Sequence, residues 1–397
     1  MITAIFVTIF LVVIYFDYKA YRRWFSCWRR FWRGIVVTLL SIANFLPLAV
    51  MAMFKVFRDN AEWQTSFVSW IFTIYLIVTL SRLVFYCIVF AVKPSSVANA
   101  VAILSAATVF GVLVYGMAVT RADIIVEEVE IRHKDIPTTF DGYKIVHFSD
   151  LHIGSLLDAE REIDSLVDII NRQDGDLVVF SGDLVHIRHS ELKEKVSQRL
   201  AAIRSRDGVV AVLGNHDVGV YVKDTVALPS EENVRLLSAK IADMGWRLLC
   251  DSTLYIKRGT DSVAVTGVAF SDELLEYKHS FNVPDKFSAA TLYESLPDSI
   301  FNITVSHLPQ LWDKLKEGKK SDLTLAGHVH AMQMKCRIGT LALSPAMLMY
   351  SEWSGLYGNE EEGYLYINDG IGSVGYYMRI GANPTVTVYT LKCSRSE

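Results

Sequence analysis

Four long apolar stretches in the first 120 residues limit the folds open to this chain more than any other feature. They occupy residues 2–16, 35–54, 67–92 and 97–120. A helix needs about 20 residues to cross the hydrocarbon core of a membrane, and the last three stretches are long enough. The first is shorter and would need local thinning of the bilayer or support from neighbouring helices. The alternative, four buried helices of a soluble core, is disfavoured because residues 35–54 contain no charged side chain.

The charges divide the chain into a basic and an acidic part. Residues 1–120 hold ten of the 39 Lys and Arg but only three of the 43 Asp and Glu, which gives about +7 there and about −11 in the rest. Such an asymmetry indicates two different physical environments. A nucleic-acid partner would require a basic face, so we expect no nucleic acid to bind the acidic part.

The segment DYKAYRRWFSCWRRFWR, residues 17–33, sets the expected orientation in the membrane. It joins the first two apolar stretches and combines six basic residues with Trp24, Trp28 and Trp32. Aromatic and basic residues are typical of a membrane interface, and basic loops stay on the cytoplasmic side. With three or four spans, residues after 120 then lie outside the cytoplasm, so we expect a multi-pass protein of the cell membrane with an extracytoplasmic C-terminal domain. Arg82, inside the third stretch, either has a functional role or extends toward the headgroups.

After residue 120 the sequence alternates buried strands with amphipathic helices. YKIVHFSD, DLVVFSGD and GVVAVLGNHD are typical of buried strands, and DAEREIDSLVDIIN of a helix between the first two. We expect a membrane domain of about four helices over residues 1–120, a linker with an edge strand over 121–140, and an α/β domain over 141–397. Short strands dominate after Cys336, and we expect these late strands to form a second sheet packed on the first.

Polar, metal-binding side chains follow five of the predicted strands. In open α/β sheets ligands collect beyond the carboxyl ends of the strands, so we expect these residues to meet at one sheet edge. The seven candidate ligands are Asp150, His152, Asp183, Asn215, His307, His328 and His330.

This set of oxygen and nitrogen donors suits Zn, Fe or Mn and does not suit calcium. Seven side chains are too many for one tetrahedral ion but fit two ions that share a bridging carboxylate. Two such ions can bind both the attacking and the leaving oxygen of a phosphoryl displacement. We therefore expect two divalent ions, with Asp183 between them and Gly182 allowing the tight turn beneath it.

The motif series D-x-H, G-D, G-N-H-D, H and G-H-x-H resembles the calcineurin-like metallophosphoesterase family, in particular its bacterial membrane-associated branch. The resemblance covers about residues 141–392 and implies a four-layer αββα sandwich. It also implies a catalytic mechanism in which a metal-bridging hydroxide attacks phosphorus. The resemblance implies that Asp150, His152 and His330 hold a first ion and that Asn215, His307 and His328 hold a second. It implies that Asp183 bridges the two ions. It further implies that His216, oriented by Asp217, contacts phosphate and protonates the leaving oxygen.

The sequence departs from the family pattern directly after the last motif. GHVHAMQ carries Ala331 and Met332 where that branch commonly has two glycines, which makes the shape of the leaving-group pocket uncertain. His186 and His189 follow Asp183 closely. They are either additional ligands or residues behind the ligands, and the second interpretation is favoured because the seven-residue set is already complete.

The function expected from these features is that of a membrane-anchored, manganese-, iron- or zinc-dependent phosphoesterase. Its substrate would be a phosphomonoester, phosphodiester or pyrophosphate, and the membrane anchor suggests a lipid-linked or membrane-proximal form. The stretch SPAMLMYSEWSGLYG either lines an acyl-accepting groove or is an ordinary core-and-loop segment. Two alternatives stay open: a UDP-diacylglucosamine-type pyrophosphatase, whose cytoplasmic substrate conflicts with the expected orientation, and a non-catalytic metal-binding membrane protein.

Overall fold

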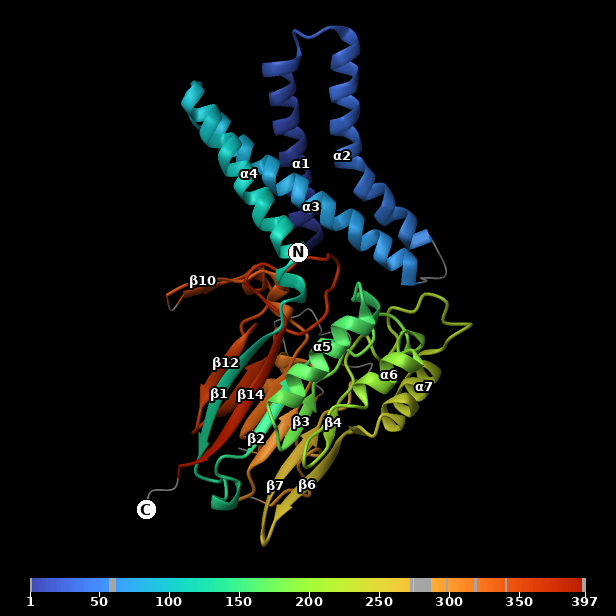
Figure 1. Ribbon diagram of the computed structural model, residues 1–397, viewed down its shortest axis with the longest axis vertical. Helices are drawn as coiled ribbons and strands as arrows, with labels where there is room; N and C mark the ends of the chain where they lie inside the picture. The colour runs from blue at the N-terminus through green and yellow to red at the C-terminus, as the bar shows by residue number, and fades with distance from the viewer. Residues whose placement is uncertain are drawn as a thin grey trace. The chain divides into compact units, whose positions relative to one another are not determined.

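The computed structural model describes residues 2–56, 62–271, 274, 287–297, 299–317, 320–339 and 341–394 (Figure 1). The chain forms two compact units. One consists of Met1–Val119 with the short segment Gly375–Met378, and the other of Thr120–Val374 with Arg379–Glu397. The boundary after Val119 falls one residue before the end of the expected membrane domain.

The first unit is helical. Its helices are α1 (Ile2–Ala20), α2 (Arg30–Val56), α3 (Glu62–Ala91) and α4 (Ser96–Ala118). Three segments are long and apolar enough to cross a membrane, namely Arg30–Val50, Trp63–Ala91 and Ser96–Ala122. The three longer apolar stretches therefore do form such helices, whereas α1 is not among the candidate spans in the described part of the chain. A fourth span stays a prediction.

The basic segment between the first two stretches is mostly helical, which differs from the expected loop. α1 continues to Ala20 and passes into a π-helical turn, Tyr21–Phe25, before α2 begins at Arg30. Aromatic packing accounts for this extension, because the Trp24 ring lies 5.8 Å from that of Phe85 and 5.9 Å from that of Phe90, measured between centroids.

Arg82 of α3 forms a polar cluster inside this unit. Its Nη2 lies 3.4 Å from Asp17 Oδ2 of α1 and donates to Asn44 Oδ1 of α2 at 2.8 Å. Asn44 donates to the same Asp17 carboxylate at 2.6 Å, and the Tyr86 hydroxyl donates to its other oxygen at 2.6 Å. The guanidinium is therefore paired within the bundle, and the expectation that it extends toward the headgroups is wrong.

The second unit contains two six-stranded sheets. In the first, β2 (Lys144–Phe148), β3 (Leu177–Phe180), β4 (Val209–Ala211) and β5 (Arg247–Leu248) run parallel. On the other side of β2 come antiparallel β14 (Thr385–Cys393) and then the edge strand β1 (Ile125–His133), giving the order β1-β14-β2-β3-β4-β5.

The second sheet has the order β12-β13-β9-β8-β7-β6. These strands are β12 (Gly355–Asn359), β13 (Gly363–Ile367), β9 (Leu323–Ala326), β8 (Asn302–Val305), β7 (Asp261–Gly267) and β6 (Ser252–Arg258), and a separate hairpin joins β10 (Cys336–Ile338) to β11 (Leu341–Leu343). The expectation for the late strands is therefore only partly right. β14, the last strand, belongs to the first sheet, where it pairs with β1 and β2 and buries Val386 on one face and Tyr389 on the other.

The alternation of side chains along the strands builds the layers. Val146 and Phe148 of β2 face helix α5 (Ala159–Arg172), which buries Ile163 and Leu166 against them. The intervening Ile145 faces the second sheet and joins one core with residues of β7, β8 and β9. α6 (Glu194–Leu200) and α7 (Ser230–Asp243) cover the same face as α5 (Figure 1). The short helix α9 (Trp312–Leu315) and its flanking turns cover the outer face of the second sheet. The fold is an α/β sandwich of two mixed sheets, as expected.

Candidate metal centre

Every candidate ligand follows the carboxyl end of a strand. Asp150 and His152 come after β2, Asp183 after β3, and Asn215 after β4, while the three remaining histidines follow β8 and β9 of the other sheet. The two sheets therefore contribute ligands to one place. The parallel run of β2, β3 and β4 brings the first four together, as the pattern of strand ends predicts.

Asp150, His152 and His330 form one group of possible metal ligands. His330 Nε2 lies 3.2 Å from Asp150 Oδ1 and 3.2 Å from His152 Nε2, and His152 Nε2 lies 3.9 Å from the same carboxylate oxygen. All three side chains are buried. One ligand atom from each residue lies within 4.8 Å of the others, so the three donors can bind one cation.

Asp183, His307 and His328 form a second group. His307 Nε2 lies 3.2 Å from Asp183 Oδ2 and 3.1 Å from Asn215 Oδ1, so the amide oxygen of Asn215 joins this group. The other ring nitrogen of His307 pairs with the carbonyl oxygen of Ser181 at 2.9 Å, which fixes the orientation of the ring.

Asp183 lies between the two groups. Its Oδ2 is 3.2 Å from His307 Nε2 in the second group and 3.6 Å from His152 Nε2 in the first. Its Oδ1 accepts the backbone N–H of His216 at 2.8 Å, which holds the carboxylate in place. This is the position that a bridging carboxylate would need.

The electrostatics of the centre favour bound cations. Asp150 and Asp183 are buried, and buried carboxylates require a positively charged partner or a metal. Burial alone would lower the pKa of His307, but the Asp183 and Asp150 carboxylates raise it to about 9. Burial and the neighbouring His216 and His330 rings hold the pKa of His152 well below its ordinary value. The Asp150 and Asp183 carboxylates attract positive charge, whereas the His152 imidazole stays neutral. Together they offer a cation negatively charged oxygen ligands and a neutral nitrogen ligand.

The backbone at the centre is strained. Five of the predicted residues have positive φ angles, namely Asp150 (51°), His152 (42°), Asp183 (62°), His328 (72°) and His330 (52°). Left-handed backbone at non-glycine residues costs of order 1–3 kcal/mol each and concentrates at functional sites. Glycines make room for the carboxylates, since a Cβ on Gly327 would collide with Asp150 and one on Gly214 with Asp183.

Asp217 has other partners than expected. Its carboxylate accepts the backbone N–H groups of Asp183 at 2.8 Å, Gly214 at 2.9 Å and Val185 at 3.0 Å. The ring of His216 instead pairs its Nδ1 with the carbonyl oxygen of His186 at 2.5 Å. The expectation that Asp217 orients His216 is therefore wrong. Asp217 holds the loops after β3 and β4 together, because a carboxylate satisfies several N–H donors at once.

Three residues at the centre are not predicted from the sequence. The Tyr221 ring lies 4.2 Å from that of His216 between centroids, and its hydroxyl accepts from Asn215 Nδ2 at 3.2 Å. The Tyr350 hydroxyl is 3.5 Å from His328 Nε2. Arg379 is fully buried with Nη2 3.3 Å from His330 Nδ1. No spacing rule links these residues to the motifs, because the chain reaches the centre again through long turns.

The turn after His330 keeps a left-handed backbone without glycine. Ala331 (φ 49°), Met332 (φ 45°) and Gln333 (φ 57°) all adopt it. Ala331 is fully buried, and Gln333 accepts the backbone N–H of Val374 at 2.6 Å. The replacement of two glycines thus changes the side chains at this turn but leaves its backbone conformation accessible.

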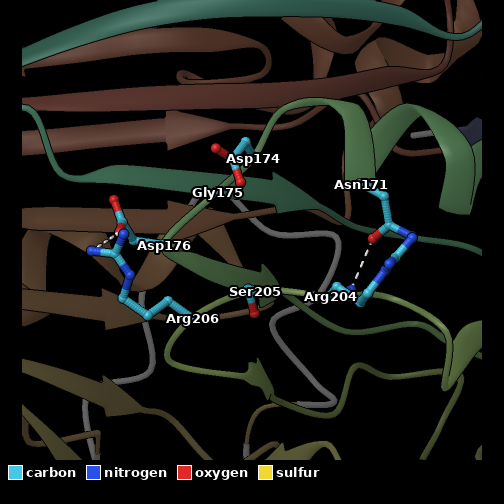
Figure 2. A pocket seen from close by; sticks show the side chains of 7 residues that line it. All are labelled: Asn171, Asp174, Gly175, Asp176, Arg204, Ser205 and Arg206. Carbon is cyan, nitrogen blue, oxygen red and sulfur yellow. Dashed lines mark hydrogen bonds and ion pairs between the residues drawn. The ribbon is translucent and has the colours of Figure 1, made fainter.

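A separate concavity of about 500 Å³ lies at the amino ends of β3 and β4, the end opposite to the candidate ligands (Figure 2). Its polar groups bind one another: Arg206 Nη1 lies 3.0 Å from Asp176 Oδ1, and Asn171 Oδ1 accepts the backbone N–H of Arg204 at 2.8 Å. None of the predicted site residues lines it.

Comparison with known proteins gives a family match for the α/β domain. Residues 143–332 match the family model described as calcineurin-like phosphoesterase, so the chain contains a calcineurin-like metallophosphoesterase domain. The uncharacterized metallophosphoesterase YkuE of Bacillus subtilis is 28% identical over 285 residues, 70% of this chain and 90% of that protein. A transmembrane protein with metallophosphoesterase domain from Danio rerio is 25% identical over 381 residues, 92% of this chain and 81% of that protein. The second similarity extends over the apolar helices as well as the α/β domain.

Proposed function

We propose that this protein is a membrane-anchored phosphoesterase that acts with two divalent metal ions. The observation that carries the proposal is the position of Asp183 between two groups of candidate ligands, 3.6 Å from His152 and 3.2 Å from His307. Asp150, His152 and His330 would hold one ion; Asn215, His307 and His328 would hold the other; Asp183 would contact both. Such a pair of Mn, Fe or Zn ions supplies an activated water and a positive charge that stabilises the phosphoryl group during displacement.

His216 is the residue proposed to transfer a proton. Its Nδ1 pairs with the His186 carbonyl, so Nδ1 carries the proton and Nε2 is the free nitrogen. The Tyr221 ring packs against the imidazole and limits its rotation. Once its Nε2 is protonated, His216 would contact a phosphoryl oxygen and donate that proton to the leaving oxygen.

The first test measures hydrolysis of an aryl phosphodiester by the full-length protein in detergent, after metal removal and reloading with Mn²⁺. Asp183→Asn should abolish turnover and lower the number of tightly bound ions. Asp168→Asn makes the same chemical change at a side chain 71% exposed on α5 and should behave like the parent. A parent protein that binds two ions but hydrolyses no phosphoester would instead support a non-catalytic metal-binding protein.

The role of His216 has its own expected result. His216→Asn should lower kcat by about 10²–10⁴-fold, the usual contribution of a general acid. It should leave the number of bound ions at the parent value, because His216 is not one of the proposed ligands. Equal kcat in variant and parent would remove His216 from the mechanism.

We also propose that the substrate is linked to a lipid. Ile338 and Leu341 of the β10–β11 hairpin are 67% and 55% exposed, and Leu348 in the following turn is 59% exposed. Two residues later Tyr350 is buried against His328. We call these three exposed residues (Ile338, Leu341 and Leu348) the apolar surface. They precede Tyr350 by 2 to 12 residues in the chain, and we propose that they contact an acyl chain attached to the phosphoester.

Lipid linkage is tested by comparing a long-chain phosphoester in mixed micelles with a soluble aryl ester. Leu348→Ser should lower kcat/KM about tenfold for the long-chain ester and less than twofold for the soluble one, because it removes apolar contact area. Val226→Ser, at a side chain 93% exposed and outside that surface, is the control. Equal effects on both esters would exclude acyl contact at Leu348.

We propose that the domain is extracytoplasmic, and the basic segment 17–33 supports this orientation. A reporter enzyme that is active only outside the cytoplasm, fused after Glu397, should be active. A reporter active only in the cytoplasm should then be inactive at the same site. The reverse pattern would invert the topology and make a cytoplasmic nucleotide–lipid pyrophosphate a suitable substrate.

A further inference from the structure

His186 has no role in the site described so far, yet its side chain is buried there. It is 7% exposed, and its Nδ1 is buried without a hydrogen-bond partner in the part of the chain that the structure describes. A buried polar atom without a partner is destabilising, so one that a native fold retains calls for an explanation such as a bound ion.

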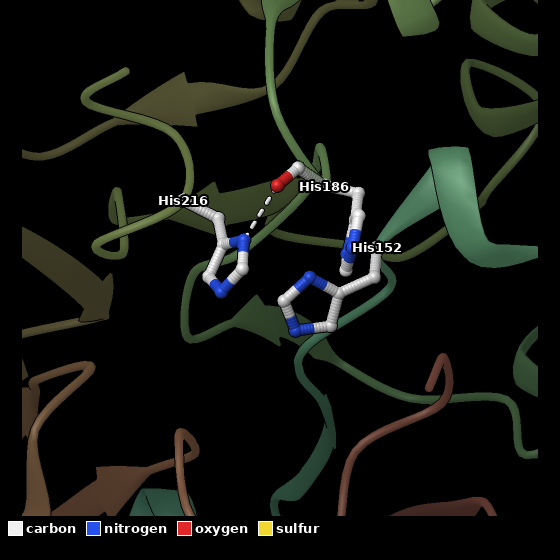
Figure 3. A group of neighbouring side chains, drawn as sticks. All are labelled: His152, His186 and His216. Atoms are coloured by element: carbon white, nitrogen blue, oxygen red, sulfur yellow. Dashed lines mark hydrogen bonds between the residues drawn. The ribbon is translucent and has the colours of Figure 1, made fainter. Parts of the chain in front are cut away.

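The neighbours of His186 are imidazoles of the metal centre (Figure 3). Its ring centroid lies 5.3 Å from that of His152 and 5.2 Å from that of His216. One nitrogen from each of these three rings falls within 4.8 Å of the others, which makes them a group of possible metal ligands. Metal–nitrogen bonds of about 2.0–2.1 Å place two donors of one ion up to about 4.2 Å apart, so small ring rotations suffice.

The backbone around His186 is fixed. The buried Glu191 carboxylate accepts the N–H of His186 at 2.5 Å, of Ile187 at 2.8 Å and of Gly154 at 3.2 Å. The His186 carbonyl in turn accepts from His216. The Glu191 bonds tie the loop after β3 to the turn that carries His152, so the His186 ring is held beside that ligand in advance.

We propose that His186 is an additional nitrogen ligand of the metal centre, on its His152 side. The inference rests on the proposed function, since it adds a residue to the same pair of ions. His186 follows Asp183 by three residues, so one short loop would supply both the bridging carboxylate and a further nitrogen donor.

The test uses the full-length protein in detergent, stripped of metal and reloaded with Co²⁺. The variants are His186→Gln and His186→Ala, and the matched control is His189→Gln. His189 lies on the same loop and belongs to none of the ligand groups in the described residues. The readouts are the number of bound ions, their affinity by chelator competition, and the visible absorption bands of Co²⁺, which report its ligands.

Both His186 variants should bind one of the two ions about 10- to 100-fold more weakly and shift the Co²⁺ bands. His189→Gln should match the parent in both readouts. Thermal unfolding of the metal-free proteins shows whether each variant folds. If His186→Ala does not fold, His186→Gln, which retains a polar side chain, still tests the proposal. A folded His186→Gln with the affinity and spectrum of a two-ion parent would overturn this inference alone. A parent that binds no Co²⁺ would overturn the proposed function.

Discussion

At the scale of single residues, the carboxylates at the centre perform two different tasks. Asp183 faces ligands, whereas Asp217 faces three backbone N–H groups of the loops after β3 and β4. The G-N-H-D motif places Asp217 next to His216 in the chain. This neighbourhood does not show which way the Asp217 side chain points or which N–H groups it contacts. The strand ends predict that the candidate ligands lie together, as they do, whereas the contacts of Asp217 depend on the loop geometry.

Asp217→Asn should lower the free energy of unfolding by about 1–3 kcal/mol, because an amide oxygen cannot accept all three bonds and its NH₂ group meets a donor. Thermal unfolding of the metal-free full-length protein measures this loss. Asp168→Asn on the exposed face of α5 should leave the unfolding temperature unchanged. A stable Asp217→Asn variant that only loses activity would show that the carboxylate acts in catalysis after all.

His147 makes stability depend on pH. It is buried on β2 between the hydroxyl groups of Tyr389 and Ser181, each 2.9 Å away, and burial lowers its pKa to about 3. The unfolded chain takes up a proton near pH 6.5 while the folded chain does not. Stability is therefore complete above pH 6.5 and declines as the pH falls toward 3, by up to about 1.4 kcal/mol per pH unit.

His147→Gln keeps hydrogen-bonding groups but cannot titrate. Between pH 7.5 and 5.0 the metal-free parent should lose about 2 kcal/mol more stability than this variant. Denaturant unfolding at the two pH values measures the difference. The same loss in both proteins would mean that other buried groups set the acid sensitivity.

At the scale of elements, the sequence pattern locates strands better than it assigns them to sheets. The buried runs before Asp150, Asp183 and His307 are β2, β3 and β8, as predicted. The position of β14 between β1 and β2 depends on pairing across more than 200 residues of chain, and residue periodicity does not encode a partner. The helical continuation of α1 through Phe25 likewise depends on aromatic contacts with α3.

The polar cluster of α1, α2 and α3 should stabilise the helical unit. Asp17→Leu would leave the largely buried Arg82 guanidinium, 18% exposed, without its carboxylate, at a cost of up to about 3–5 kcal/mol. Asp17→Leu combined with Arg82→Leu should recover most of that loss, because no unpaired charge remains. Hydrogen exchange of α1–α3 peptides from the detergent-solubilised protein measures the stability. If the double variant loses as much stability as Asp17→Leu and Arg82→Leu lose in sum, the two residues are energetically independent.

At the scale of the whole molecule, the two units differ in what holds them together. In the part of the chain that the structure describes, the helical unit has three helices apolar enough to cross a membrane and an internal polar cluster. The α/β unit encloses strained backbone and buried carboxylates among its candidate ligands. Ions that bind only the folded α/β unit stabilise it by mass action, by about 2.7 kcal/mol at a free concentration 100 times the dissociation constant. Chelation should therefore affect the two units unequally.

Hydrogen exchange on the full-length protein, with and without chelator, tests this difference within one sample. Peptides covering the loops after β2, β3 and β9 should lose protection by about 100-fold when metal is removed, the equivalent of 2.7 kcal/mol. Peptides from α2, α3 and α4 should exchange at the same rate in both conditions, because no proposed ligand lies in them. Equal deprotection of the helices would mean that the units unfold cooperatively, and unchanged exchange everywhere would mean that the ligands hold no metal in solution.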